Sequence, residues 1–219
     1  MQGFSVKLPG LFFISFCCMF FVCAAGLLYA ESAGETAWPK YVIDGDTLVL
    51  KDGRHVRYIG INAPETPKRD KKGEPYGNAA KKFHRHILKS GNIRMEYDRE
   101  RKDHYGRTLA WIWMQDGSLL NELLLREGYA HCLYDKKNHK YWDRLLDAQQ
   151  KAMKEKKGIW KDLYRKKGKV LGHTGSRRFH DPRCDIAGQI AARNRKWFKS
   201  PWQAYLEGYS PSKKCSAAR

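Results

Sequence analysis

The stretch from Ile43 to Glu65 constrains the fold more than any other, because two alternating runs of apolar and polar residues flank an Asp-Gly pair at 52–53. Such a pair between alternating runs is a strong signal for a tight β-hairpin. With a two-residue turn, Leu48 faces Arg57, and Arg57 lies diagonal to Asp46 on one face of the hairpin, about 7–8 Å away. That spacing predicts a place for a metal ion or a phosphate group between the two side chains.

Asp44 adds a second acid to the same face, since side chains two residues apart on a strand point to the same side. One interpretation of Asp44, Asp46 and Arg57 is therefore a metal and phosphate site. The alternative is an ordinary cross-strand ion pair between Asp46 and Arg57. For Glu65, which follows the hairpin, the alternative is a solvated loop carboxylate.

The N-terminal segment is almost uninterrupted apolar sequence from Leu11 to Leu28, preceded by Lys7 and followed by the small residue Ala30. This pattern predicts a secretory signal over residues 1–30 with cleavage near Ala30. An uncleaved membrane anchor is the alternative, because about 18 apolar residues also span a bilayer. Either way we expect the remainder outside the cytoplasm, secreted or periplasmic, and held at a membrane only if the segment stays uncleaved.

The chain is strongly basic, with a formal net charge of +19. Lys and Arg side chains neutralise phosphates and release counterions, so binding to a polyanion would depend strongly on salt. A solvated surface, or attraction to an anionic cell envelope, would also account for the charge alone. The charge and the hairpin site together favour nucleic acid as the partner.

The central part of the chain mixes strand and helix patterns. The predicted elements are, in order, a helix at 76–89, strands at 93–98 and 106–115, a helix from Ser118 as N-cap to Gly128 as C-terminal stop, a short strand at 129–134 and a helix at 141–157. Early strands with interleaved helices predict an α+β domain around a small antiparallel barrel. Trp111, Trp113 and Trp160 are most simply core residues.

Six motifs in residues 40–160 make the family recognisable: IDGDT, VRYIGINAPE, YGNAA, DHYGRTLAWI, LLNELLLREGYA and a terminal GIW. This region resembles the staphylococcal nuclease, or thermonuclease, family. The resemblance implies an OB-fold with a five-stranded antiparallel barrel and about three helices over residues 38–162. It also implies a monomeric, calcium-dependent phosphodiesterase that cuts DNA and RNA with low sequence specificity and leaves 3′-phosphate products.

The resemblance also implies roles around the metal. Asp46 matches the family's metal-binding aspartate, Asn62 matches a second ligand position, and Ala63 would offer its backbone carbonyl. Asp44 matches an acid beside the metal. Glu65 matches the carboxylate that orients or deprotonates the attacking water.

Four further residues match substrate-binding positions. Arg57 and Arg107 match the two arginines that clamp the phosphate, and Tyr105 and Tyr134 match tyrosines of the nucleotide pocket. The chemistry requires the same residue types, because planar guanidinium groups bind the charge that develops on phosphodiester oxygens better than ammonium groups do. All-oxygen ligands favour a hard cation such as Ca²⁺ or Mg²⁺.

Two positions depart from the family pattern. Asn62 stands where the family has an aspartate, and an uncharged amide predicts weaker metal binding or a changed metal preference. His104 stands where a lysine is usual, so the charge at the pocket rim could depend on pH, although an exposed histidine without a role is the commoner case.

Beyond the central domain, residues 163–177 have the basic, glycine-containing composition of a linker. Residues 178–219 then resemble the small metal-binding module of the Ada DNA-repair protein. That parent pattern uses four cysteines, and only Cys184 and Cys215 have counterparts here. The resemblance therefore carries only part of the zinc site.

Cysteine usage leaves two options for this module. Three of the six cysteines, Cys132, Cys184 and Cys215, lie beyond the N-terminal segment, which allows at most one intrachain disulfide. His180 or His173 could complete a Zn²⁺ site with Cys184 and Cys215. Outside the cytoplasm, a disulfide that closes so small a unit is favoured over zinc.

Two functions from different classes fit the chain. The favoured hypothesis is an exported nuclease that uses calcium with Asp46, Asn62, Glu65, Arg57 and Arg107. The alternative is a noncatalytic OB-fold protein that binds single-stranded nucleic acid by charge and stacking. Glu65 and the two arginines favour the nuclease, and Asn62 is the feature that favours the alternative.

Overall fold

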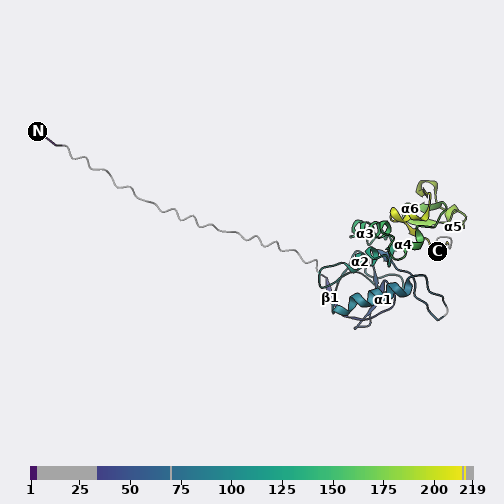
Figure 1. The fold of residues 1–219 in the computed structure, drawn as a ribbon, viewed down its shortest axis with the longest axis horizontal. Coiled ribbons are helices and arrows are strands. Elements are labelled where there is room, and N and C mark those ends of the chain that lie inside the picture. Colours follow the sequence, from purple (N-terminus) through teal and green to yellow (C-terminus); the bar gives the residue numbers. More distant parts are fainter. Residues whose placement is uncertain (4–33, 70, 214, 216–219) are drawn as a thin grey trace. The chain divides into compact units, whose positions relative to one another are not determined.

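A computed structural model describes residues 1–3, 34–69, 71–213 and 215, and the fold begins at the first strand, β1. The signal or anchor expected over residues 1–30 thus falls almost wholly outside the described residues. Among the helices that the structure describes, none is both long and apolar enough to cross a bilayer. The described residues from β1 onward belong to one compact unit, drawn in Figure 1 from β1 through α6.

The main sheet of this unit has six strands in the order β1-β6-β7-β4-β3-β2. Their bounds are β1 Glu35–Ala37, β2 Pro39–Val42, β3 Thr47–Leu50, β4 His55–Tyr58, β6 Ile93–Glu96 and β7 Thr108–Trp113. β4 and β7 pair in parallel, whereas the other pairs are antiparallel. A separate two-stranded ladder joins β5 (Ile61–Asn62) to β8 (His131–Cys132). The fold is therefore mixed α+β.

The β3–β4 hairpin has a different register from the one predicted. Thr47 pairs with Arg57 and Leu48 pairs with Val56, so Leu48 does not face Arg57. The loop contains three residues, 51–53, because Leu50 N–H already donates to the Arg54 carbonyl at 2.9 Å. Gly53, at φ +89°, takes the left-handed position that closes such a loop. The predicted hairpin is correct, and its predicted two-residue turn is wrong.

Helices pack against these strands at the expected places. They are α1 (Gly77–Ile87), continued by the 3₁₀ turn η1 (Leu88–Ser90), α2 (Leu120–Arg126), α3 (Trp142–Lys154) and the short α4 (Trp160–Leu163). The N-cap of α2 is Leu119 rather than Ser118, whose hydroxyl donates instead to Asp116 in the preceding turn. Gly128, at φ +71°, follows the end of α2 as predicted.

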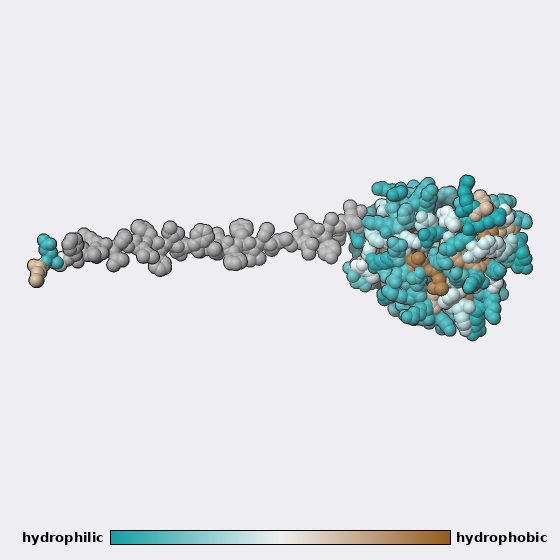
Figure 2. Space-filling view, turned by 90° about the horizontal axis from the view of Figure 1, so that it is seen from above, coloured by the Kyte–Doolittle hydropathy of each residue, from teal (hydrophilic) through white to brown (hydrophobic). Residues whose placement is uncertain are grey.

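The core of this part is built from large apolar side chains. Trp111 and Trp160 are fully buried in two separate clusters, and Trp113 packs against the cluster of Trp111, which confirms the structural role expected for the three tryptophans. Cys132 is a buried free thiol. The face shown in Figure 2 is predominantly hydrophilic, in keeping with the basic composition.

The C-terminal part forms its own four-stranded sheet in the order β11-β9-β10-β12. Its elements are β9 (Val170–His173), β10 (Arg178–His180), α5 (Asp185–Gly188), the 3₁₀ turn η2 (Ala192–Asn194), β11 (Arg195–Phe198), α6 (Pro201–Leu206) and β12 (Ser210–Pro211). The expected linker over 163–177 is therefore wrong from residue 170 onward. Val170 and Leu171 are buried in this sheet, because two apolar residues suffice to form a short central strand inside a basic segment.

α3 and the short α4 connect the C-terminal sheet to the rest of the unit through polar and apolar contacts. The buried amide of Gln149 donates to the Tyr205 carbonyl of α6 and accepts from the Cys132 N–H of β8, both at 2.6 Å. The ring of Trp160 meets that of Tyr205 edge-on at 5.1 Å. Figure 1 shows α3 and α6 at this junction. The C-terminal sheet is therefore packed onto the part of the chain that contains the main sheet and is not separated from it by a free linker.

Candidate active site

The Asp44–Asp46 turn is shaped by the glycine between the two acids. A Cβ atom on Gly45 would lie 2.5 Å from the Cβ of Ala63 and 2.8 Å from that of Ala80, so only glycine allows this close approach. The Asp46 N–H donates to Asp44 Oδ1 at 3.1 Å. Burial and the neighbouring Asp46 carboxylate both raise the pKa of Asp44. The motif thus places two carboxylates on a tight, buried turn.

Asp46 is bonded directly to Arg57, without the predicted gap between them. Its Oδ2 atom lies 3.1 Å from Arg57 Nη2 and accepts from the Ala63 N–H at 2.5 Å, while Oδ1 accepts from the Thr47 hydroxyl at 3.0 Å. The direct bond follows from the observed register, which moves Arg57 one residue closer to the start of β3. Both side chains are largely buried, with Asp46 5% and Arg57 8% exposed.

Asn62 joins the same pair. Arg57 Nη2 also donates to Asn62 Oδ1 at 3.1 Å, and Arg57 Nη1 donates to the Tyr58 carbonyl at 3.0 Å. The oxygens of Asp46 and Asn62 therefore converge on one guanidinium nitrogen. This convergence is the central geometric feature of the site.

His131 determines which way the Asn62 amide points. The antiparallel β5–β8 ladder sets the two residues opposite each other. His131 Nδ1 contacts the Cys132 carbonyl at 3.0 Å, which requires Nδ1 to carry the proton, so Nε2 accepts from Asn62 Nδ2 at 3.4 Å. Burial holds the pKa of His131 at about 4, so the ring is neutral near pH 7. The amide oxygen consequently faces Arg57.

The donor set around Asp46 fits a hard cation better than a soft one. Asp46 and Asn62 offer oxygens, and the carbonyl of the buried Ala63 lies beside them, 3.4 Å from Asn62 Nδ2. Within the described part of the chain, the one cluster of three His, Cys, Asp or Glu side chains close enough to share a metal lies elsewhere, at 180, 184 and 215. A metal at Asp46 would thus rely on amide and carbonyl oxygens and water as much as on carboxylates.

Glu65 is fixed through its backbone while its carboxylate stays exposed. Its N–H donates to Glu74 Oε2 at 3.0 Å and its carbonyl accepts from the Glu74 N–H at 2.8 Å. A Cβ atom on Gly77, the first residue of α1, would lie 2.3 Å from the same carbonyl. The carboxylate is 48% exposed and lies 3.2 Å from Lys68 Nζ. The loop therefore presents a positioned carboxylate to solvent.

Arg107 belongs to a more exposed region. It donates through Nε to Asp103 Oδ2 at 2.8 Å, and its guanidinium lies 5.4 Å from the ring centre of Tyr105, which is 73% exposed. Parallel pairing of β4 with β7 brings Arg107, just before β7, to the strand that carries Arg57. The described contacts of Arg107 are with Asp103 and Tyr105, and they do not include Arg57.

Tyr134 is only partly buried, but its ring is well covered. The ring meets Trp142 edge-on at 5.0 Å, and the guanidinium of Arg177 lies 4.8 Å from its centre. Arg177 has the left-handed φ of +50°, which is uncommon for a residue with a side chain. The C-terminal part thus contributes to the surroundings of Tyr134.

Sequence reasoning missed His84, a fully buried residue of α1. Its Nδ1–H donates to the Asp44 carbonyl at 2.8 Å, and its Nε2 accepts from the Tyr58 hydroxyl at 2.6 Å. Burial lowers the pKa of His84 to about 4. His84 therefore links α1 to the acidic turn as a neutral ring. Its place in the apolar stripe of the helix, four residues after Ala80, was the available signal.

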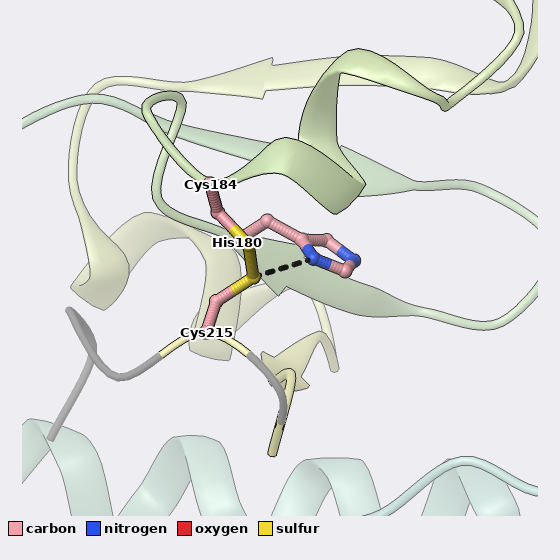
Figure 3. Close-up of side chains that lie close together, drawn as sticks. All are labelled: His180, Cys184 and Cys215. Atoms are coloured by element: carbon pink, nitrogen blue, oxygen red, sulfur yellow. Dashed lines mark hydrogen bonds between the residues drawn. A yellow bond between two sulfur atoms is a disulfide. The ribbon is translucent and has the colours of Figure 1, made fainter.

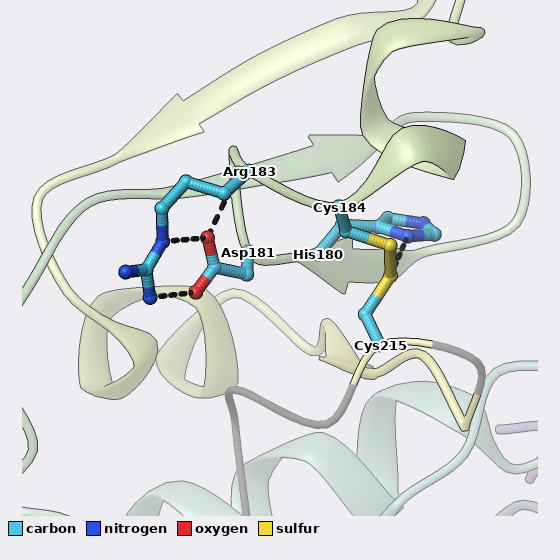
Figure 4. Close-up of a disulfide and its surroundings, with 5 residues drawn as sticks. All are labelled: His180, Asp181, Arg183, Cys184 and Cys215. Atoms are coloured by element: carbon cyan, nitrogen blue, oxygen red, sulfur yellow. Dashed lines mark hydrogen bonds and ion pairs between the residues drawn. A yellow bond between two sulfur atoms is a disulfide. The ribbon is translucent and has the colours of Figure 1, made fainter.

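The cysteines of the C-terminal part are joined. Cys184 and Cys215 form a disulfide, the pairing favoured from the sequence, and His180 Nδ1 lies 3.2 Å from Cys215 Sγ (Figure 3). Asp181 and Arg183 form an ion pair at 2.8 Å in the turn between His180 and Cys184 (Figure 4). In this form neither sulfur is a thiolate, so the pair fastens the chain near residue 215 instead of supplying zinc ligands.

Comparison with known protein families identifies the class of protein to which the chain belongs. A family model described as "Staphylococcal nuclease homologue" matches residues 55–162, which contain Arg57, Asn62, Glu65 and Arg107. The match ends before the C-terminal sheet.

Individual relatives then specify the family. The thermonuclease of Staphylococcus hyicus is 43% identical over 122 residues, which cover 54% of this chain and 72% of the relative. The thermonuclease of Staphylococcus intermedius is 44% identical over 130 residues, covering 58% and 77%. Endonuclease YncB of Bacillus subtilis is 39% identical over 123 residues, covering 54% and 58%. The chain belongs to the staphylococcal nuclease family and is a nuclease, an enzyme that hydrolyses phosphodiester bonds.

Proposed function

We propose that this nuclease is an exported, calcium-dependent phosphodiesterase that cuts DNA and RNA with low sequence specificity, leaves 3′-phosphate ends and acts as a monomer. The observation that carries the proposal is the convergence of Asp46 and Asn62 oxygens on Arg57 Nη2, each at 3.1 Å. An acidic and amide oxygen pair beside a buried guanidinium suits a cation and a phosphate bound next to each other.

The metal would be held by Asp46, Asn62 and the carbonyl of Ala63, with Asp44 adjacent. When bound, Ca²⁺ supplies positive charge that stabilises the charge developing on the phosphodiester oxygens. Mg²⁺ or another hard divalent cation is a second candidate for the same oxygens. Because Asn62 brings no charge, we expect weaker calcium binding than a carboxylate at this position would give.

Glu65 is proposed to orient and deprotonate the attacking water. Its backbone is held by Glu74 while its carboxylate is exposed, so the group can accept a proton from water without losing its position. Arg57 and Arg107 are proposed to bind the phosphate oxygens. Arg57 has five N–H donors. Its described contacts are with three protein groups, the Tyr58 carbonyl, Asn62 and Asp46, so donors remain for a ligand.

The two tyrosines are proposed to contact the nucleotide to different extents. Tyr105 is exposed beside Arg107 and can pack against a sugar or base. Tyr134 has one face under Arg177, so its contribution is restricted to the rest of the ring.

The architecture beyond the family match is proposed on the resemblance. We propose an OB-fold barrel with about three helices over residues 38–162 and an Ada-like module over residues 178–219; the expectation that all five barrel strands are antiparallel is wrong for the β4–β7 pair. Export rests on the apolar pattern within residues 1–30, which would act as a cleaved signal or as a membrane anchor.

A cleavage assay tests the proposed function. Denatured DNA and single-stranded RNA are incubated with the full chain in Ca²⁺, in Mg²⁺ and in EDTA, and the product ends are analysed. We expect rapid cleavage of both in Ca²⁺, little in EDTA, and 3′-phosphate ends. Cleavage that persists in EDTA, or products with 5′-phosphate ends, would contradict the proposal. Binding without cleavage in any metal would favour a noncatalytic nucleic-acid-binding protein.

A further inference from the structure

A cavity of about 510 Å³ lies between the proposed active site and the C-terminal sheet. Its volume is in the range that holds a ligand the size of a nucleotide. The nuclease wall includes Asn62, Glu65 and Tyr76, and the C-terminal wall includes Arg178 and Lys213. The cavity is therefore continuous with the candidate site, but part of its wall comes from residues that the family match does not cover.

Arg178, the first residue of β10, has an uncommon set of partners. Its Nη1 donates to Ser210 Oγ at 2.9 Å and to the Ser176 carbonyl at 3.4 Å, and its Nη2 donates to the Tyr134 carbonyl at 3.3 Å. All three acceptors are neutral. Among the described ion pairs, none joins Arg178 to a carboxylate.

A half-buried guanidinium held only by neutral oxygens is costly for the folded protein. Burial lowers the pKa of Arg178, and the charge of Asp135 opposes this shift without reversing it, so the charged form loses hydration without full compensation. An anion in the cavity would supply that compensation. Phosphate is the anion that a guanidinium binds best, through two parallel N–H···O bonds.

Lys213 adds a second cation from the segment after β12. Its side chain is exposed and lines the same cavity. The segment is held at both ends, since the Ser212 N–H donates to the Phe179 carbonyl at 2.9 Å and Cys215 is bonded to Cys184. The C-terminal wall is therefore cationic and anchored.

The opposite wall explains how a ligand would lie. Three carboxylates of the lining, Glu65, Glu74 and Asp162, belong to the nuclease segments, and Tyr76 donates to Asp162 at 3.1 Å. Away from the proposed metal and Arg57, a phosphate next to these acids would be repelled, so the favourable position is at Arg178 and Lys213, and Lys166 is a further cation of the lining. Apolar lining residues such as Pro64 and Pro211 suit the sugar and base between the two walls.

We propose that the C-terminal sheet forms the second wall of the substrate cleft, in which Arg178 and Lys213 bind a backbone phosphate of the polynucleotide strand next to the one being cleaved. The ligand class is single-stranded nucleic acid, because unpaired bases are free to enter a cavity of this size. The inference rests on the proposed function, since it places the bound strand at Asn62 and Glu65.

The test is binding of a fluorescent single-stranded oligonucleotide to the full chain in EDTA, followed by anisotropy over a range of salt. The double variant Arg178→Gln with Lys213→Gln should raise Kd at least about tenfold. It should reduce the slope of log Kd against log salt by about 0.7 per lost phosphate contact. The matched control is Arg193→Gln with Lys199→Gln, which removes two exposed charges of the same part away from the cavity. The control should leave the slope unchanged.

Equal changes of Kd and of salt slope in the two double variants would overturn the inference. Lys213→Gln alone guards against misfolding of the Arg178 variant, since Lys213 is exposed; an unchanged salt slope in this single variant would also overturn it. Arg178→Lys should restore only part of the affinity, because an ammonium group cannot form the paired bonds.

Hydrolysis of a nitrophenyl phosphodiester of a single nucleotide separates the two proposals. That substrate has no neighbouring phosphate, so its cleavage by the wild type depends on the proposed active site and not on the C-terminal wall. Failure of the wild type to cleave it with any metal would count against the proposed function, whereas the binding comparison would still decide the role of the C-terminal wall.

Discussion

Arg57 in the hairpin and Arg178 in the C-terminal sheet are both taken partly out of water, but their charges are compensated in different ways. Arg57 has a carboxylate partner, Asp46, at 3.1 Å, together with amide and carbonyl oxygens. Arg178 has a hydroxyl and two carbonyl oxygens. Asp46 compensates the buried charge of Arg57 within the protein, whereas the hydrogen-bond acceptors of Arg178 are all neutral and leave part of its charge for an external anion to compensate.

The comparison also separates two ways of holding a functional residue. The hairpin site is held by the core of the main sheet, through the fully buried His84 and Tyr58 behind the acidic turn. The C-terminal wall belongs to a small sheet that is closed by a disulfide and packed on α3. We therefore expect the rate of cleavage to depend on the hairpin site and the affinity for the polynucleotide strand to depend on the C-terminal wall.

The largest expected effect is the loss of catalytic rate in Arg57→Lys. The lysine keeps the positive charge but cannot make several planar bonds to the phosphate, so kcat should fall by about 10²–10³. Arg54→Lys changes a partly exposed arginine of the same hairpin that pairs with Asp52 and Glu35; it is the control and should stay within about twofold. A rate near that of wild type in Arg57→Lys would remove the guanidinium from its proposed role.

Unfolding in urea should show that the two arginines contribute differently to the stability of the folded protein. Arg57→Gln leaves Asp46 buried without its partner and should lower the free energy of unfolding by about 3–5 kcal/mol. Arg178→Gln removes a charge that has no carboxylate partner among the described ion pairs, so the loss should be below about 1 kcal/mol. Similar losses for the two variants would show that both arginines are equally structural.

Removing the disulfide should weaken the second region selectively. The bond joins residues 31 apart, and chain-entropy arguments give a loss of about 4 kcal/mol when it is cut. Cys184→Ser with Cys215→Ser should unfold at lower urea and bind the oligonucleotide more weakly, while the nitrophenyl substrate is still cleaved. Adding a reductant to this variant should change nothing further, whereas reductant on the wild type should reproduce the variant.

The smallest effect concerns acid stability through His84. Its pKa is about 4 in the folded chain and about 6.5 when unfolded, so the unfolded state gains a proton first as the pH falls. The contribution of neutral His84 to the free energy of unfolding is fully present above pH 6.5 and should fall by about 3 kcal/mol by pH 4.

Urea unfolding in EDTA at several pH values measures the His84 contribution. His84→Gln should remove about half of the fall in stability between pH 6.5 and 4, because His131, whose pKa is also about 4, contributes a similar fall. His86→Gln changes an exposed histidine of the same helix and should leave the pH dependence as in wild type. An equal slope in all three proteins would exclude His84 as the source.

The sequence was sufficient to predict the helices, the strands and the family, because strand alternation, helix spacing and six motifs agree over residues 40–160. It was insufficient for the hairpin register. Gly53 is compatible with loops of two or three residues, and the choice is visible only in the bond from Leu50 N–H to the Arg54 carbonyl. One residue of register decides whether Asp46 and Arg57 are separated or bonded.

Residues whose partners are distant in sequence were also missed. His84 contacts a carbonyl 40 residues earlier, and Arg178 contacts Tyr134, 44 residues earlier. No local pattern reports such contacts. Strand β9 was mistaken for linker because its basic and glycine-rich surroundings outweighed the two buried residues Val170 and Leu171.

The most direct test of the central claim is single-turnover cleavage of single-stranded DNA by Glu65→Gln in Ca²⁺, with oligonucleotide binding measured in parallel. Glu65 is exposed and its backbone bonds do not involve the carboxylate, so the fold should be unaffected. The account predicts that most turnover is lost while Kd stays within about threefold of wild type. Unchanged turnover would contradict the proposed active site.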